Sequence, residues 1–219
     1  KLIRAGREVV GSKGLFITKK RYAIKIYDLE GNKVDKIKAM GLDLKRSDTP
    51  GYIQEFLSTV LDKVLVGAIE QDVMDFIADF RLEFKKKPGW EKGSPRRVNK
   101  LTEYHSREKR KGKVNMPGHV RAAINWNTLK KVYNDKYSMD IIDGQKCIVC
   151  KLKDNPMGYT SIAYPTDELR IPEWFKEMPF ADDEMETTLI NKKLDNLIGV
   201  LNWDLGASEA DNTFDKLFG

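Results

Sequence analysis

The chain has 219 residues, 41% hydrophobic and 33% charged, which is enough for one large domain with a real core, or for a domain plus a smaller piece. It contains no run approaching the roughly 18 apolar residues that a membrane-spanning helix needs, and we see no signal peptide in it. Cys147 and Cys150 are the only cysteines. This excludes a disulfide framework and is typical of proteins of a reducing cytosol.

The formal net charge of the chain is +6, and its charged residues are distributed unevenly along the sequence. Residues 85–113 carry twelve Lys and Arg against three Glu, a local charge of +9, whereas residues 167–219 carry five Lys and Arg against thirteen Asp and Glu, a local charge of −8. The basic part can neutralise phosphates. We expect the acidic part to stay away from nucleic acid, or to be offered to a protein partner.

The first 40 residues predict β-structure after a short helical start. We expect residues 1–10 to be the end of a helix, which the glycines of residues 11–14 break. Residues 16–26 then predict a single buried strand. The Gly31-Asn32 pair supplies easy positive φ for a hairpin turn, and a second strand is expected at residues 34–38.

Two amphipathic helices follow. Thr49 at the N-cap and Pro50 at the first helical position predict the start of the first, and Gly67 marks its end. Because their apolar residues recur at helical spacing, we expect the two helices to pack against each other. These residues are Ile53, Phe56, Leu57, Val60, Leu61 and Val64 in the first helix, and Val73, Phe76, Ile77, Phe80 and Phe84 in the second.

The remaining chain predicts a mixture of helices and short strands. Residues 92–113 hold Gly93, Pro95 and Gly112 among basic residues and few apolar anchors, so we expect a loop, or a partly disordered segment until it meets a polyanion. The predicted fold class is α+β: mostly helical, with a small inserted β element and a preceding β-hairpin. The further helices are expected at residues 120–133, 172–178 and 187–201, and the inserted strands at residues 146–152 and 161–164.

No catalytic or metal-binding constellation can be found. Cys147 and Cys150 have zinc-like spacing, but no second pair completes four ligands, and His105 and His119 are too few to do so. We find no Ser/His/acid or Cys/His set that would indicate nucleophilic catalysis. No phosphate-binding Gly-rich loop of the G-x-x-x-x-G-K-[ST] type is present. We therefore predict no catalytic residue and no metal site.

Basic side chains beside aromatic ones predict nucleic-acid binding. Lys19-Lys20-Arg21-Tyr22 stands at the head of Ala23-Ile24-Lys25-Ile26-Tyr27, a run typical of a buried strand, which would hold these charges in fixed directions. Ordinary solvated surface lysines are the alternative. His119 and Arg121 stand at an expected helix start, where backbone amides and side-chain donors converge. The predicted DNA-binding residues are Lys19, Lys20, Arg21, Tyr22, Lys45, Arg46, His119, Arg121, Lys130 and Lys131.

Several stretches carry a resemblance to one family. Lys19-Lys20-Arg21-Tyr22-Ala23 resembles the lysine-tyrosine motif near the end of the palm of B-family DNA polymerases. The rest of the chain resembles the thumb of the replicative polymerases of T-even-type bacteriophages. The further stretches that match in the family's order are Lys38-Ala39-Met40-Gly41-Leu42, Ser47-Asp48-Thr49-Pro50, His119-Val120-Arg121, Asn125-Trp126-Asn127, Asp143-Gly144-Gln145-Lys146, Asn155-Pro156-Met157-Gly158 and Ile162-Ala163-Tyr164-Pro165.

The resemblance implies a division into parts. Residues 1–40 would be the C-terminal end of a palm, residues 41–206 the thumb, and residues 207–219 a flexible tail that binds the sliding clamp. Thr213-Phe214-Asp215-Lys216-Leu217-Phe218 resembles the family's clamp-docking peptide, so Phe214, Leu217 and Phe218 are the predicted clamp contacts. A contact between this tail and the thumb itself is the alternative.

The resemblance also implies a function. The chain would grip primer-template DNA through contacts that do not depend on sequence, in the cytoplasm of an infected bacterial host. Its partners would be the duplex, the sliding clamp and the remaining palm, fingers and exonuclease parts. The family's metal-binding aspartates precede this segment, and no Asp-Thr-Asp occurs here, so Mg²⁺ is expected in the complete polymerase and no cofactor in this chain.

Two questions stay open at this point. The chain begins with Lys1, and it would be either an excised fragment of a longer polymerase or one chain of a split one, inactive alone in both cases. The alternative class is a non-enzymatic nucleic-acid-binding protein built on a polymerase-like module. It would bind DNA, or RNA through the basic segment of residues 92–113.

Overall fold

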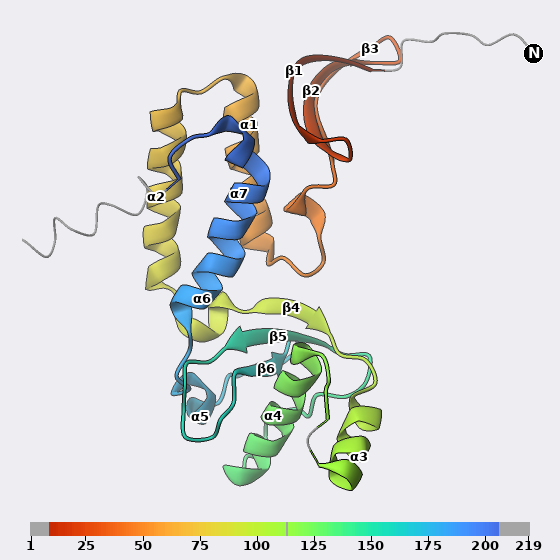
Figure 1. Cartoon of the computed structure of the whole chain (residues 1–219), viewed down its shortest axis with the longest axis vertical. Helices are drawn as coiled ribbons and strands as arrows, with labels where there is room; N and C mark the ends of the chain where they lie inside the picture. The colour runs from red at the N-terminus through yellow and green to blue at the C-terminus, as the bar shows by residue number, and fades with distance from the viewer. Residues whose placement is uncertain (1–8, 113, 206–219) are drawn as a thin grey trace, which may run out of the picture. The chain divides into compact units, whose positions relative to one another are not determined.

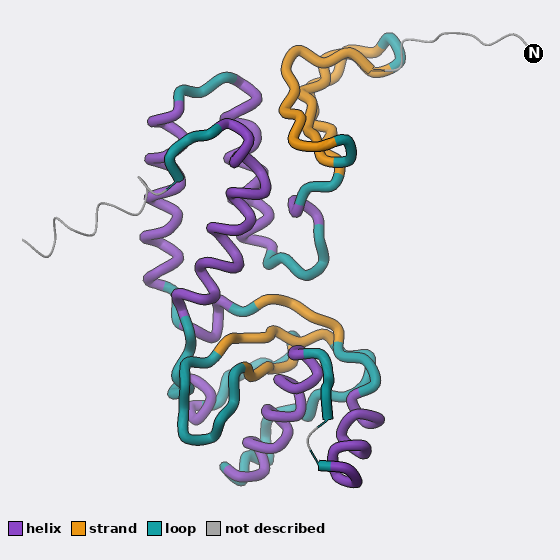
Figure 2. Tube along the Cα trace, in the orientation of Figure 1, coloured by secondary structure: helices purple, strands orange, loops and turns teal. Residues whose placement is uncertain are grey.

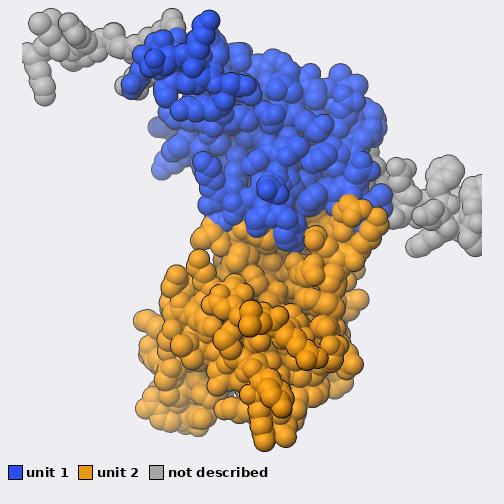
Figure 3. Space-filling model, turned by 180° about the vertical axis from the view of Figure 1, so that it is seen from behind, with its two compact units in different colours: residues 1–46, 51–82, 191–219 blue, residues 47–50, 83–190 orange. Residues whose placement is uncertain are grey.

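The computed structural model describes residues 9–112 and 114–205 of the chain, which form two compact units (Figure 3). Unit 1 contains the described parts of residues 1–46, 51–82 and 191–219, and unit 2 contains those of residues 47–50 and 83–190. The described residues form helices and two three-stranded antiparallel sheets (Figure 2), which confirms the α+β class. No described helix is both long and apolar enough to span a membrane.

The sheet of unit 1 is a meander of β1 (Val9–Thr18), β2 (Arg21–Leu29) and β3 (Asn32–Met40). Glu30 and Gly31 both have positive φ in the turn between β2 and β3, and Asp28 accepts a hydrogen bond from the Gly31 amide at 2.9 Å. The expected hairpin is therefore confirmed, with its turn one residue earlier than Gly31-Asn32.

Two expectations for this region are wrong. Residues 16–26 do not form one strand, because the chain reverses at Lys19-Lys20 between β1 and β2. The apolar pattern continues on both sides of this turn, and no Gly, Pro or Asn marks it. Residues 9–10 belong to β1 and not to a helix, while the rest of that expected helix lies outside the described residues.

The helices of unit 1 pack as their apolar stripes predict. The Phe56 ring of α1 (Gly51–Val66) stacks on Phe80 of α2 (Glu70–Lys86), with 3.8 Å between the ring centroids. α7 (Lys192–Ile198) contacts α1 and runs alongside it in Figure 1. The sheet is attached to α1 by polar contacts, since Lys25 pairs with Asp62 at 3.4 Å. The 3-10 turns of this unit are η1 (Asp43–Lys45) and η4 (Gly199–Leu201).

Unit 2 is built around a second sheet in the order β4-β5-β6. The helix α4 packs on β6, and both elements, like β5, lie where the sequence predicts them. Its elements are η2 (Gly89–Lys92), β4 (Ser94–Arg97), α3 (Leu101–Lys111), α4 (Gly118–Val132), β5 (Lys146–Lys151), β6 (Ser161–Pro165), α5 (Glu173–Lys176), α6 (Asp182–Glu186) and, running into unit 1, the π-helix Thr187–Asn191.

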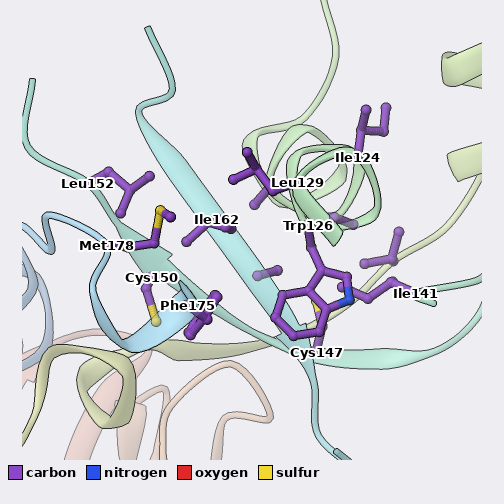
Figure 4. Packing of buried hydrophobic residues seen from close by; sticks show 14 of the residues in the cluster. Ile124, Trp126, Leu129, Ile141, Cys147, Cys150, Leu152, Ile162, Phe175 and Met178 are labelled. Carbon is purple, nitrogen blue, oxygen red and sulfur yellow. The ribbon is translucent and has the colours of Figure 1, made fainter. Parts of the chain in front are cut away.

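Trp126 stands at the centre of the core of unit 2 (Figure 4). Its side chain is fully buried, its ring meets Phe175 edge-on at 5.2 Å, and its Nε1 donates to the Met139 carbonyl at 2.9 Å. Cys147 and Cys150 are buried free thiols in the same core. Burial raises the pKa of Cys147 to about 12, so this thiol stays protonated at neutral pH.

The expectation of a loop at residues 92–113 is wrong, because much of this segment is β4 and α3. β4 pairs with β5, from Ser94 opposite Val149 to Arg97 opposite Lys146. The start of α3 is capped from far along the chain by Asp143, whose carboxylate accepts hydrogen bonds from the Leu101 and Thr102 amides and from the Thr102 hydroxyl. These long-range partners supply the order that the local sequence lacks.

Candidate nucleic-acid interface

The Lys19-Lys20 turn lies beside an apolar row at one end of the sheet of unit 1. Tyr22 stands opposite Phe16 on β1 and opposite Met40 on β3, so the three side chains share one face. The Phe16 and Tyr22 rings stack with centroids 6.0 Å apart, and 66% of Phe16 and 49% of Met40 are exposed. Both lysines of the turn are exposed. The end of the sheet thus offers cations next to an exposed apolar row.

Arg21 and Gly41 hold this turn in place. The Arg21 guanidinium donates to the Asn196 carbonyl at 2.6 Å and to its side-chain oxygen at 3.4 Å, which joins the turn to α7. A Cβ at Gly41, where φ is +67°, would stand 2.3 Å from the Lys20 carbonyl oxygen. The chain can therefore pass this close to the turn only with a glycine here.

Lys45 and Arg46 follow in unit 1, at the end of η1. Lys45 is exposed, whereas Arg46 pairs with Asp43 at 3.4 Å. Asp43 also pairs with Lys193 at 3.4 Å, so this carboxylate joins η1 to α7. Both predicted residues are exposed, and Arg46 is the one with an ion pair to η1.

Unit 2 contains a cavity of about 390 Å³ with three basic side chains in its lining, Arg96, His119 and Lys151. Arg96 pairs with Asp48 at 2.9 Å. Burial, and then the nearby charge of Arg96, lower the pKa of His119 from its ordinary value, so this imidazole is neutral at pH 7. Gly118, the first residue of α4, lines the same cavity. The arrangement can donate hydrogen bonds to a phosphate.

Arg96 and Lys151 were not predicted as site residues. Lys151 lies in a strand opposite Ser161, and Arg96 lies in the strand β4, which was expected to be a loop. Only the register of the β4-β5-β6 sheet turns these residues towards His119. The basic composition of residues 85–113 was the one signal for Arg96 in the sequence.

Arg121 and Lys130 are engaged within unit 2. Arg121 donates to the Glu108 carboxylate and to the Val114 carbonyl, at 3.1 Å in the latter case, and so joins α4 to the end of α3. Lys130 pairs with Asp140 at 2.8 Å, and its side chain is only 12% exposed. Lys131 is exposed. The DNA-binding role of these residues stays a prediction, and Phe214, Leu217 and Phe218 lie outside the described residues.

The structure thus brings Lys19, Lys20 and Tyr22 together in unit 1, and His119 together with Arg96 in unit 2. Within residues 9–112 and 114–205, no three His, Cys, Asp or Glu side chains are grouped as ligands for a metal ion. These two sets of side chains place amines and a guanidinium beside apolar and aromatic groups. Such groups can bind anions.

Comparison with known proteins points to one class, DNA-directed DNA polymerases of bacteriophages. The chain is 28% identical over 163 residues to the DNA-directed DNA polymerase of Enterobacteria phage T4, and 29% identical over 163 residues to that of Escherichia phage RB69. Both matches cover 72% of this chain but 18% of the relative, so the chain spans less than a fifth of the length of these curated relatives. No family model matches it. The expected resemblance to polymerases of T-even-type bacteriophages is confirmed.

Proposed function

We propose that this chain is the C-terminal part of a replicative phage-type DNA polymerase, and that it holds primer-template duplex. The observation that carries the proposal is the exposed Lys19-Lys20 turn beside the row of Phe16, Tyr22 and Met40, in a chain similar to phage polymerases. In this proposal residues 1–40 end the palm, residues 41–206 form the thumb, and residues 207–219 are the tail.

The proposed grip uses the backbone of the duplex and not its bases. The amines of Lys19 and Lys20 would contact phosphates, while the stacked ring of Tyr22 lies against sugars and the minor-groove edge. Arg96 and Lys151 would supply further phosphate donors from unit 2. An enzyme that copies any sequence needs contacts of this kind, because base-specific hydrogen bonds would make affinity depend on the template.

The chemistry of nucleotide transfer would be supplied by another part of the polymerase. Two Mg²⁺ ions held by palm aspartates align the primer hydroxyl with the incoming triphosphate in such enzymes, and this chain has no Asp-Thr-Asp. In the proposal the chain is inactive alone, as a fragment or as one chain of a split enzyme, and acts in the cytoplasm of the infected host.

Binding of the chain to duplex DNA is expected to be strong at low salt and indifferent to sequence. Each phosphate that the chain neutralises contributes about −0.9 to the slope of log affinity against log salt. An equilibrium titration of two recessed-end duplexes with unrelated sequences, at four salt concentrations, measures both properties. We expect the two duplexes to give the same slope, steeper than about −2. A flat salt response, or slopes that differ between the sequences, contradicts the proposed grip.

The tail is proposed to bind the sliding clamp through Phe214, Leu217 and Phe218, which are apolar residues in an otherwise polar terminal segment. Deleting residues 213–219 is expected to abolish binding to the cognate clamp and to leave the affinity for duplex DNA nearly unchanged. Surface plasmon resonance with immobilised clamp, and with immobilised duplex as the control, measures the two effects. Equal clamp binding by the truncated chain would refute the proposal. A tether of this kind raises processivity through effective concentration.

A second candidate function is RNA binding by a chain without polymerase activity. The observation that favours it is the helix α3, whose last turn carries Lys109, Arg110 and Lys111, all exposed. Basic helices of this kind bind the backbone of structured RNA. A direct comparison of DNA with RNA distinguishes the two candidates.

A further inference from the structure

Unit 2 contains a second cavity, which the proposed DNA grip does not use. It has a volume of about 500 Å³ and lies between residues 135–139, which follow α4, and residues 167–174, which follow β6. Two of its lining side chains are large, apolar and almost completely exposed, with 99% of Tyr137 and all of Leu169 accessible to solvent. Exposed apolar groups around a cavity are typical of a surface that a partner covers.

The walls of this cavity are held together by hydrogen bonds. The Asp135 carboxylate accepts from the Trp174 indole at 2.9 Å and from the Ser138 hydroxyl at 2.7 Å. The Glu168 carboxylate accepts from the Met139 amide at 2.8 Å. Each bond to Trp174 or Met139 joins one wall to the other, so the cavity is formed before any partner arrives, and binding would not have to order these loops.

The lining of the cavity is negatively charged. Asp135, Asp167, Glu168 and Glu173 contribute four carboxylates against the single cation Arg170. Burial alone would raise the pKa of Asp135, but the hydrogen bonds from Trp174, Ser138 and Tyr137 outweigh it and lower that pKa to about 2. The acidic character therefore persists across the physiological pH range, and a phosphate backbone would be repelled here.

We propose that this acidic, apolar cavity is a docking site for a peptide segment of a protein partner in which a leucine or an aromatic residue is flanked by lysine or arginine. The apolar residue of the partner would enter between Tyr137 and Leu169. Its cations would lie against Asp167 and Glu173. Charge complementarity at the rim gives such a site its specificity and its association rate, while the buried apolar anchor gives most of the affinity.

The basic cavity and this acidic cavity lie towards opposite ends of α4. Gly118 and His119, at the start of this helix, line the basic cavity, and residues 135–139 follow its end. A helix of 15 residues is about 22 Å long at 1.5 Å per residue. A partner in the acidic cavity would therefore leave the phosphate donors at the other end of the helix accessible.

The test is a fluorescence-anisotropy titration of the chain with the labelled peptide Lys-Arg-Leu-Trp-Arg-Lys, capped at both ends. The cavity variant combines Asp167→Lys with Leu169→Ser, two exposed positions where folding should not be disturbed. We expect its Kd for the peptide to rise by about tenfold or more, as for the loss of an interface hot spot. The matched control combines Asp154→Lys with Ile142→Ser, an exposed acid and an exposed apolar residue of the same unit that do not line the cavity. It should change Kd less than about twofold.

Two further peptides separate apolar docking from simple charge attraction. In the first, Gly-Ser replaces Leu-Trp between the same four cations, and it should bind at least about tenfold more weakly than the Leu-Trp peptide. In the second, glutamates replace the cations around Leu-Trp, and it should be weakened by at least as much. Equal binding by the cavity variant and the wild type, equal binding of the Gly-Ser peptide, or no binding of the Leu-Trp peptide would each overturn the proposal. Displacement of the peptide by a DNA duplex from both the wild type and the Asp154 and Ile142 control, whose cavities are intact, would assign the cavity to nucleic acid and overturn it too. Circular dichroism melting of each variant confirms that the fold is retained.

Discussion

Replacing Lys19 and Lys20 together with alanine is expected to weaken binding to a recessed-end duplex by about 60-fold at 0.1 M salt. If each amine neutralises one phosphate, the slope of log affinity against log salt is less steep by about 1.8 in the double variant. Over the tenfold range from 1 M to 0.1 M salt, this difference in slope amounts to a difference in affinity of about 60-fold. The difference between variant and wild type should therefore vanish near 1 M salt. Equilibrium titrations of both proteins over this salt range measure the effect.

The control for this variant removes the same charge from the same sheet. Lys33 and Lys36 are exposed on β3, towards the turn between β2 and β3, which lies at the opposite end of the sheet from the Lys19-Lys20 turn. Their replacement by alanine should change affinity at 0.1 M salt by less than about threefold. If both double variants lose the same affinity, then binding depends on net charge and not on the Lys19-Lys20 turn, and the proposed contact is wrong.

Trp126→Ala is expected to lower the free energy of unfolding of unit 2 by about 3–5 kcal/mol. The indole is fully buried among Phe175, Ile162 and Cys147, and its removal leaves a cavity and an unpaired Met139 carbonyl. A loss of this size is a large fraction of the roughly 5–15 kcal/mol that stabilises a typical domain. Urea denaturation followed by circular dichroism measures it.

Val132→Ala is the matched control, since Val132 ends the same helix and is 70% exposed. It should change the free energy of unfolding by less than about 0.5 kcal/mol. A loss below about 1 kcal/mol for Trp126→Ala would mean that the core of unit 2 does not depend on this indole, contrary to its central position.

The parts of the fold that could be predicted are those whose signal is local. The apolar residues at helical spacing, Phe56 and Phe80 among them, predicted both helices and their packing. The missed elements depend on distant partners. β4 becomes a strand because β5 pairs with it, and α3 begins where it does because Asp143 caps it from 41 residues away or more. Neither partner is visible in the composition of residues 92–113.

The candidate site also has residues that the local sequence could predict and residues whose role depends on distant partners. Lys19, Lys20 and Tyr22 were found because cations and an aromatic residue are adjacent in the sequence, and they are adjacent in space as well. The sequence could not show that Arg21 donates to Asn196 or that Arg121 pairs with Glu108, because those partners come from other elements. A basic residue counts as a phosphate donor only once its neighbours in the fold are known.

The measurement that tests the central proposal most directly is a competition of three nucleic acids for the chain at one salt concentration. A recessed-end DNA duplex, the same duplex with blunt ends, and an RNA hairpin of equal length and charge are titrated against a labelled duplex. We predict that the recessed-end duplex competes best, about fivefold or more better than the RNA, and that Lys19→Ala with Lys20→Ala removes this preference. Equal or stronger competition by the RNA hairpin would contradict a polymerase grip on primer-template DNA and favour the RNA-binding alternative.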